Sequence, residues 1–455
     1  MRGDSMRRFT RRATLLGGAG LLAGCESITD TFDNWFGERK VPLKGDRKPV
    51  LTADRALGVD PNETRPVALP PATAVAEWPQ AGGVPSHAAG HPALGSGLRQ
   101  VWSTSIGTGA GYRRRLVSPP LVANGLVFAA DAYGEVTALD AATGRERWSF
   151  DTRPKKERDG ALGAGLAFDA GILYVVTGLA EAMAFDAATG KLGWRAPLPA
   201  PARGAPTVAG GRIFVLTTEN HLLSLSITDG ARQWTYRGQP TTTMVLGLPA
   251  PAVEGETVVA GFASGELAAL RTQDGRLIWS ETLSSARGGG LADIAAITAM
   301  PVIDRNRVIA AGLGGLAIAI DLRSGRRLWE RDVAVGETPW AAGEWIFLVT
   351  TGGDLACLGR EDGRVRWITP LGRYQNPEKR RDPYIWGPPT LAGGRLLVAN
   401  SLGRMVEVDP LTGEKASEIK LPASTTLAPA LAGGMLYLLT DGGDVVAMRG
   451  NTPGT

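Results

Sequence analysis

Residues 119–148 read PPLVANGLVFAADAYGEVTALDAATGRERW, and this stretch decides the fold. Its short β-prone runs are separated by turn signals such as Asn124-Gly125, and the last run ends on Trp148. Turn dipeptides between apolar runs of this kind are typical of antiparallel hairpins. In the closing turn, Asp140 can bond back to the backbone, and Gly144 can adopt a backbone angle that other residues avoid. The stretch therefore predicts four antiparallel strands.

The same unit recurs along the chain, and its recurrence predicts the number of blades. The glycine of the closing turn recurs as Gly144, Gly190, Gly230, Gly275, Gly325, Gly363 and Gly413. All but the last of these glycines are followed four residues later by a tryptophan, and the last has Ser417 instead. The segments that open each unit begin near Pro119, Gly165, Pro206, Pro251, Pro301, Pro339, Pro389 and Pro429. These openings predict eight blades.

The two ends of the repeat region complete each other. The last unit stops at Arg449, after its third strand, and a matching fourth strand stands at residues 98–102. We therefore expect an all-β fold: an eight-bladed β-propeller of four-stranded antiparallel blades over residues 98–455, closed by its N-terminal strand. The repeat tryptophans are expected to be structural and to lie between neighbouring blades: Trp102, Trp148, Trp194, Trp234, Trp279, Trp329 and Trp367.

Charge and cysteine content exclude several classes of function. The net charge of +4 is carried by residues 1–24, which hold five arginines and one aspartate, so the rest of the chain is neutral. A neutral body gives no electrostatic reason to expect a nucleic-acid partner. The chain has two cysteines, Cys25 and Cys357, and three scattered histidines, His87, His91 and His221. This content predicts no disulfide framework, no metal site and no catalytic constellation.

The first residues have the pattern of an export signal. An arginine-rich start is followed by an apolar run over residues 13–23, which is too short to span a bilayer. The run ends in Leu-Ala-Gly-Cys25, which resembles the lipobox of bacterial lipoproteins, although an ordinary signal peptide with a chance cysteine is an alternative. We expect a signal peptide over residues 1–24 and a lipid on Cys25. Residues 25–97 are rich in proline and glycine and are expected to be a tether. The stretch 77–97 is a candidate for packing on the ring.

The spacing Ala138-x-Asp140-x-x-x-Gly144-x-x-x-Trp148 resembles the repeat of the pyrroloquinoline-quinone (PQQ) propeller superfamily. Lipobox, tether and a compact eightfold repeat together resemble the BamB family, the lipoprotein subunit of the outer-membrane β-barrel assembly machinery. The resemblance implies a scaffold without catalytic activity or cofactor, anchored by lipid to the periplasmic face of the outer membrane. The implied partners are the periplasmic POTRA domains of BamA and other subunits of the machinery.

The resemblance also implies where the partner binds. In the family, the partner surface lies on connections between blades, which here correspond to residues 235–248 and 281–300. Each follows the closing strand of a blade, so both are expected on one face of the ring. The candidate residues are Met244, Val245, Leu246, Arg287, Asp293 and Ile294. The match is incomplete, because Arg237 is displaced from the family's arginine and only one acid is found where the family has two.

A third long connection, residues 371–388, is a further candidate binding site. It contains Tyr374, Lys379, Arg380, Arg381, Tyr384 and Trp386. Arginine and aromatic residues are favoured in binding hot spots.

Two other functions share the repeat. A PQQ-dependent dehydrogenase would hold its quinone and a calcium ion over the central channel, and many such enzymes use an adjacent cysteine pair, which this chain lacks. Cys357 occupies the slot that Ala138 fills in the first unit, so it is expected to be a small buried residue. A propeller of this class that binds another envelope partner is the remaining alternative.

Overall fold

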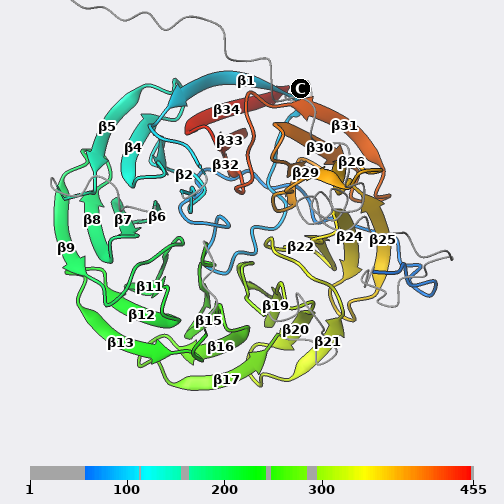
Figure 1. The fold of residues 1–455 in the computed structure, drawn as a ribbon, viewed down its shortest axis with the longest axis horizontal. Coiled ribbons are helices and arrows are strands. Elements are labelled where there is room, and N and C mark those ends of the chain that lie inside the picture. Colours follow the sequence, from blue (N-terminus) through cyan, green and yellow to red (C-terminus); the bar gives the residue numbers. More distant parts are fainter. Residues whose placement is uncertain (1–56, 112–113, 155–162, 242–246, 284–294, 452–455) are drawn as a thin grey trace, which may run out of the picture. The chain divides into compact units, whose positions relative to one another are not determined.

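The computed structural model describes residues 57–111, 114–154, 163–241, 247–283 and 295–451. All of them belong to one compact unit, Asp54–Thr455. Every regular element in the described residues is a strand, and eight four-stranded antiparallel sheets follow one another around a ring (Figure 1). The predicted eight-bladed β-propeller is confirmed. None of the described residues forms a helix with the length and apolar character needed to cross a membrane.

In blades 1 to 7 the strands run from the centre of the ring to its rim in chain order, whereas the outermost strand of blade 8 comes from the start of the domain. Blades 1 to 4 comprise β2 (Leu121–Ala123), β3 (Leu126–Ala130), β4 (Glu135–Asp140) and β5 (Glu146–Asp151); β6 (Ala164–Asp169), β7 (Ile172–Thr177), β8 (Glu181–Asp186) and β9 (Leu192–Pro197); β10 (Thr207–Ala209), β11 (Arg212–Leu216), β12 (His221–Ser226) and β13 (Arg232–Arg237); β14 (Ala252–Glu254), β15 (Thr257–Gly261), β16 (Glu266–Arg271) and β17 (Leu277–Thr282).

The second half of the ring repeats this order and adds one hairpin. Blades 5 to 8 comprise β18 (Val302–Asp304), β19 (Arg307–Ala311), β20 (Ala317–Asp321) and β21 (Arg327–Arg331); β22 (Trp340–Ala342), β23 (Trp345–Val349), β24 (Asp354–Gly359) and β25 (Val365–Pro370); β28 (Thr390–Ala392), β29 (Arg395–Ala399), β30 (Arg404–Val408) and β31 (Lys415–Lys420); β32 (Ala430–Ala432), β33 (Met435–Leu439), β34 (Asp444–Asn451) and β1 (Ser96–Ser105). The added hairpin, β26 (Tyr374–Asn376) and β27 (Arg381–Pro383), lies between blades 6 and 7.

The ring is closed by its N-terminal strand, as predicted. Strand β1 pairs antiparallel with β34, and Trp102 lies opposite Ala447 in that register. The last blade therefore takes its outermost strand from the start of the domain. Because β1 pairs with the last blade, the two ends of the repeat region are joined, and only short strand edges remain exposed.

The spacing of glycine and tryptophan in the repeat follows from the joints between blades. In blade 1, the Trp148 indole N–H donates to the carbonyl of Ala187 in the closing turn of blade 2, at 2.9 Å. Gly190 of that turn has a φ of 71°, and a Cβ there would lie 2.6 Å from the Trp148 ring. The position therefore requires glycine both for its backbone angle and for the indole that covers it.

The same bond recurs at seven of the eight joints, with N–O distances between 2.8 and 3.1 Å. The donors and acceptors are Trp102 to Ala141, Trp148 to Ala187, Trp194 to Ile227, Trp234 to Thr272, Trp279 to Leu322, Trp329 to Arg360 and Trp367 to Pro410. These tryptophans are buried or half-buried, and each stabilises its joint through both apolar burial and a hydrogen bond to a backbone carbonyl.

The eighth joint, between blades 7 and 8, is built differently. Ser417 stands where the other blades have tryptophan, and it pairs with Glu407, to which its hydroxyl donates. The Glu407 carboxylate is nearly buried and lies 3.4 Å from the guanidinium of Arg395. Arg395 also donates to the carbonyl of Gly95, at 2.8 Å, immediately before β1. The chain that leads into β1 thus takes part in the joint that has no tryptophan.

Candidate functional site

The residues that the sequence proposed for partner binding lie outside the described parts of the chain. This holds for Cys25 and for all six of Met244, Val245, Leu246, Arg287, Asp293 and Ile294. Their role stays a prediction. The described ends of both connections nevertheless define where each one leaves and re-enters the ring.

The first connection leaves β13 from a rigid base. The Tyr236 hydroxyl donates to one carboxylate oxygen of Glu266 at 2.6 Å, and the Gln239 N–H donates to the other at 2.7 Å. The Asn220 side chain donates to the carbonyl of Gln239 at 2.9 Å. Burial, reinforced by the neighbouring Glu266, raises the pKa of Tyr236, so its hydroxyl stays protonated as a donor. The start of the connection is therefore held to blade 4.

The second connection is anchored to the same blade. The N–H of Leu283, just after β17, donates to the carbonyl of Gly265 at 2.8 Å. On the return, the N–H of Ile297 donates to the carbonyl of Phe262 at 3.1 Å. Residues 262–266 form the turn between β15 and β16, and Glu266 at its end holds the first connection. Both predicted partner connections therefore border one turn, which we call the blade 4 turn.

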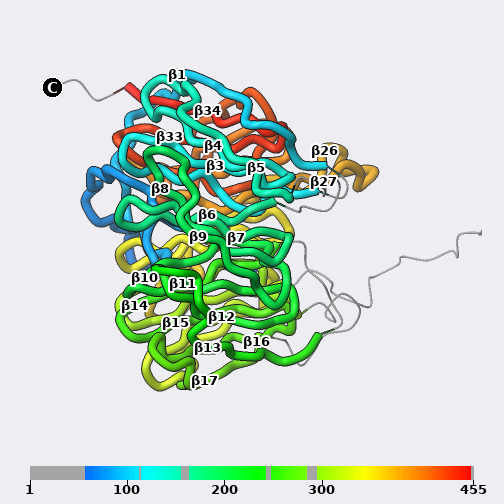
Figure 2. The backbone as a smooth tube through the Cα atoms, turned by 90° about the vertical axis from the view of Figure 1, so that its left-hand side faces the viewer, coloured from blue at the N-terminus to red at the C-terminus, as the bar shows by residue number. Residues whose placement is uncertain are grey.

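The third candidate connection forms a hairpin where the sequence indicated only a loop. Strands β26 and β27 pair through Tyr374 and Pro383 and project from the ring (Figure 2). At the base, the buried Trp386 donates its indole N–H to the carbonyl of Gly372 at 2.8 Å. Tyr384 packs on the Trp386 ring, with 5.6 Å between centroids. The aromatic residues thus hold the base, and the charged residues lie towards the tip.

The segment before β1 packs on the centre of the ring, on the side opposite the hairpin (Figures 1 and 2). Residues 75–92, which we call the hub, accept at least one hydrogen bond from each of the eight blades, and the eight that follow measure 2.7 to 2.9 Å. The donors and acceptors, from blade 8 and then blades 1 to 7, are Gly433 to Val75, Val122 to Trp78, Phe168 to Pro79, Val208 to Gln80, Val253 to Pro85, Ile303 to Ser86, Trp340 to Gly90 and Gly393 to Pro92. The hub therefore contacts the blades in their order around the ring.

The hub satisfies polar groups that the propeller fold leaves free. The innermost strand of each blade has one unpaired edge, and unpaired backbone groups in a buried position are costly. The Gln80 side chain pairs both backbone groups of Val208: it accepts from the N–H and donates to the carbonyl. Trp78 is 2% exposed and stacks on Trp340 with 6.4 Å between centroids. The hub thus combines hydrogen bonds with an apolar anchor.

Both histidines of the hub have structural contacts. The buried His87 donates from Nδ1 to the carbonyl of Pro301 at 2.7 Å, and burial lowers its pKa to about 4. His91 donates from Nδ1 to Pro70 and accepts from the N–H of Gly394 at Nε2. Because a carbonyl oxygen can only accept, both imidazoles carry a proton on Nδ1.

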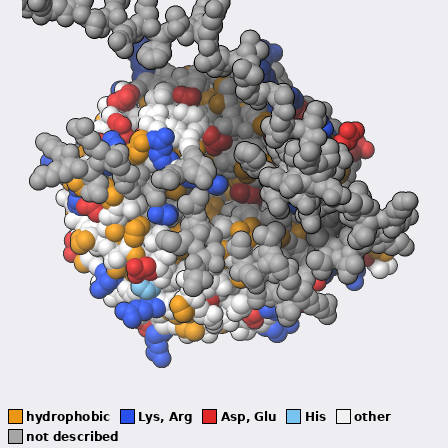
Figure 3. All heavy atoms as spheres, viewed as in Figure 1, with side chains coloured by type: hydrophobic (Ala, Val, Ile, Leu, Met, Phe, Trp, Pro, Cys, Tyr) orange, Lys and Arg blue, Asp and Glu red, His pale blue; other side chains and the backbone are white. Residues whose placement is uncertain are grey.

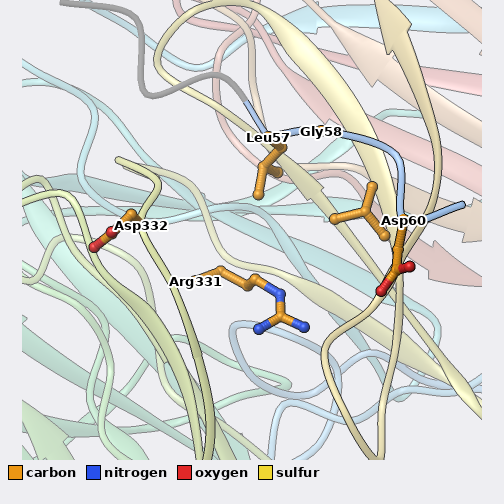
Figure 4. Close-up of a pocket in the computed structure, with 6 residues that line it drawn as sticks. Leu57, Gly58, Asp60, Arg331 and Asp332 are labelled. Atoms are coloured by element: carbon orange, nitrogen blue, oxygen red, sulfur yellow. The ribbon is translucent and has the colours of Figure 1, made fainter. Parts of the chain in front are cut away.

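A pocket of about 350 Å³ lies at the rim between blades 5 and 6, where residues 57–60 cover the outermost strands (Figure 4). It is lined by Leu57, Gly58, Asp60, Arg331, Asp332 and Val365. The Arg331 guanidinium already donates to the carbonyls of Gly363 and Asp362. Its main cationic group is thus occupied by the ring itself, and the pocket offers little to bind a ligand.

The thiol of Cys357 and the carboxyl group of Glu337 have raised pKa values. Cys357 is buried opposite Trp367, and burial raises the pKa of its thiol. Burial raises the pKa of Glu337 to about 7, and Arg115 opposes this shift. No group of three or more histidine, cysteine, aspartate or glutamate side chains in the described ranges is placed to hold a metal ion. On the face seen in Figure 3, acidic and basic side chains are interspersed around the rim.

Comparison with known proteins identifies the family. The family model described as outer membrane protein assembly factor BamB matches residues 78–158, 132–369 and 376–452. The chain belongs to the BamB family. BamB from Yersinia pestis is 28% identical over 356 residues, which cover 76% of this chain and 88% of that protein. BamB from Escherichia coli K12 is 27% identical over 354 residues, with the same coverage of both chains.

Solved structures agree with this family and show how widely the fold is shared. The crystal structure of BamB from Moraxella catarrhalis has a TM-score of 0.65 at 20% identity and covers 78% of this chain and 100% of its own. A quinohemoprotein alcohol dehydrogenase from Comamonas testosteroni reaches a TM-score of 0.62 at 14% identity, covering 83% of this chain and 82% of its own. The shared fold therefore does not separate a BamB protein from a dehydrogenase.

Proposed function

We propose that this protein is a scaffold subunit of the machinery that assembles β-barrel proteins in the outer membrane, and that it binds the periplasmic POTRA domains of BamA. The proposal rests on membership of the BamB family, whose relatives are named as assembly factors. The structural observation that carries it is the blade 4 turn. The first connection begins on this turn, where Tyr236 and Gln239 donate to Glu266. The second connection both leaves from it and returns to it, through the N–H groups of Leu283 and Ile297.

A rigid base of this kind suits a protein interface. Loops on a rigid scaffold can present side chains to a partner without a large loss of conformational entropy on binding. We propose that Met244, Val245 and Leu246 of the first connection, and Arg287, Asp293 and Ile294 of the second, contact the partner. Apolar residues flanked by an arginine and an acid match the anchors and rim of such interfaces.

We also propose the localisation that the leader sequence suggests. Residues 1–24 would be removed on export, and acylated Cys25 would hold the protein on the periplasmic face of the outer membrane. Several acyl chains on one residue give stable membrane attachment, whereas one chain does not. Labelling with a radioactive fatty acid tests this proposal, and a Cys25→Ala protein that still carries label would contradict it.

A PQQ-dependent dehydrogenase is the competing function, since those enzymes share the fold. The chain offers no adjacent cysteine pair, and its single cysteine inside the ring is buried against Trp367. These features favour the scaffold. Incubation with PQQ, calcium and alcohols tests the alternative directly, because calcium-dependent alcohol oxidation by the purified protein would overturn the scaffold proposal.

The binding proposal is tested by capture of the soluble periplasmic region of BamA from the same genome. We expect the wild-type protein to retain it. Leu246→Asp and Asp293→Arg should each weaken capture, while the exposed Leu411→Asp and Glu414→Arg on blade 7 serve as matched controls. Capture by the two loop variants equal to that of the controls would remove these loops from the interface.

A further inference from the structure

The tip of the β26–β27 hairpin carries a run of three consecutive cationic residues. Some other exposed arginines of the described residues have an acidic partner, such as Arg147 with Asp140, Arg305 with Glu344 and Arg404 with Glu418. At the hairpin tip, Lys379, Arg380 and Arg381 stand in sequence, all exposed. None of the three forms an ion pair with any residue in the described ranges.

The backbone at this tip is held in an uncommon conformation. Arg380 and Asp382 have φ values of 49° and 57°, in the left-handed region that residues with a side chain rarely adopt. Such conformations persist where the surrounding structure imposes them, and they cluster at functional sites. The base of the hairpin is fixed by the hydrogen bond of Trp386 and by the packing of Tyr384 on its ring.

Exposed apolar side chains lie beside the hairpin. Ile385 directly follows Tyr384 and is 50% exposed, and Leu402 is 41% exposed. Two hydrogen bonds between Ile385 and Ser401 bring the two segments together: the Ser401 N–H donates to the carbonyl of Ile385, and the Ile385 N–H donates to the Ser401 hydroxyl. Two exposed apolar side chains thus lie at the base of the hairpin whose tip carries the three cations.

We propose that the tip of this hairpin, with Ile385 and Leu402, is a second docking surface for the protein to which the ring binds, and that it takes an acidic patch with an apolar centre. This inference rests on the proposed function. Arginines can form bidentate bonds with carboxylates, and apolar contacts flanked by such pairs are typical of protein interfaces. The interleaved acids Glu378 and Asp382 favour a protein over a membrane, because a uniformly anionic lipid surface would repel them.

The test measures affinity for the soluble periplasmic region of BamA from the same genome, with full-length protein in detergent. Charge reversal of Lys379, Arg380 and Arg381 to glutamate is compared with reversal of three other exposed arginines that also have no ion pair in the described ranges, Arg145, Arg232 and Arg276. Both triple variants change the net charge equally. A third variant, Ile385→Ser with Leu402→Ser, tests the apolar part.

We expect the hairpin reversal to weaken binding about tenfold at low ionic strength, and to flatten the dependence of affinity on salt. The control reversal should stay within about twofold of the wild type, and the serine variant should lose affinity without a change in salt dependence. Thermal unfolding midpoints within a few degrees of the wild type would show that all variants fold.

Three other outcomes would contradict either the hairpin proposal alone or the proposed function as well. If wild type binds and the hairpin reversal binds as tightly as the control, the hairpin proposal is overturned while the proposed function stands. If wild type does not bind at all, both are overturned. If an unacylated Cys25→Ser protein binds phosphatidylglycerol vesicles through the three cations and BamA binding ignores them, the surface is a membrane contact and the proposal is wrong.

Discussion

Replacing Trp78 with alanine should remove a large part of the stability of the ring. The side chain is 2% exposed, lies among residues of blades 1, 7 and 8, and stacks on Trp340. A buried aromatic side chain of this size removes about 150–250 Å² from water, worth about 4–6 kcal/mol at 25 cal/mol per Å². Measured losses for buried tryptophan to alanine are about 3–5 kcal/mol, and the backbone bonds between Trp78 and Val122 remain. We therefore expect about 3–5 kcal/mol.

Urea unfolding followed by far-ultraviolet circular dichroism measures this loss as a shift of the midpoint at constant slope. Val84→Ala, in the same hub but 38% exposed, is the matched control and should change the free energy of unfolding by less than about 0.5 kcal/mol. Hydrogen exchange adds a local readout, because the amides of Phe168 and Ile303 donate to the hub and should lose protection in the Trp78 variant. A loss below about 1 kcal/mol, with both amides still protected, would refute the idea that the hub stabilises the ring.

Three further predictions follow from single positions. His87 has a pKa of about 4 in the folded protein and an ordinary value near 6.5 when unfolded. The free energy of unfolding should therefore fall by up to about 3 kcal/mol as the pH falls from about 6.5 to about 4. His87→Asn, which tolerates the local φ of 61°, should make the free energy of unfolding less dependent on pH in this range. Gly190→Ala should lower the free energy of unfolding by more than about 2 kcal/mol, because the new Cβ would meet the Trp148 ring. Gly171→Ala is the control: its φ is similar but the space around it is open, so it should cost about 1 kcal/mol. Equal costs in chemical unfolding would show that the indole contact does not matter. Cys357 should react with a thiol reagent only on unfolding, since the native thiol is buried and its pKa is raised; rapid labelling of the folded protein would contradict its placement.

The fold could be predicted because the residues that recur in the sequence are those that contact one another between blades. Each glycine of a closing turn accommodates the tryptophan of the preceding blade, so the two residues recur together and mark the joints. The unmatched strand around Trp102 and the incomplete last unit predicted the closure. The hub could not be predicted in the same way. Most of its acceptors are backbone carbonyls, such as those of Pro79 and Pro85, which any sequence provides, and their donors come from eight separate blades.

The candidate site was predictable only in outline. The lengths of the connections located them between named blades, but nothing in the sequence marked Glu266 as the residue that holds the first one. Glu266 begins an ordinary strand, and its role depends on Tyr236 and Gln239 in the preceding blade. The hairpin was not predicted because β26 and β27 have only three residues each and β27 includes Pro383. Strands this short show no alternation of apolar and polar residues. The cluster of aromatic residues and arginines was the useful signal there.

The contacts of the hub with all eight blades have a consequence for the order of events during folding. Val75 is synthesised among the first parts of the domain, yet its donor, Gly433, is among the last, and the partner of β1 on β34 follows later still. This segment must therefore wait for the whole chain before all its bonds can form. Pairings so distant in sequence form slowly. A truncated or misassembled chain would leave this segment extended and accessible to proteases, which would make incomplete rings recognisable to the cell.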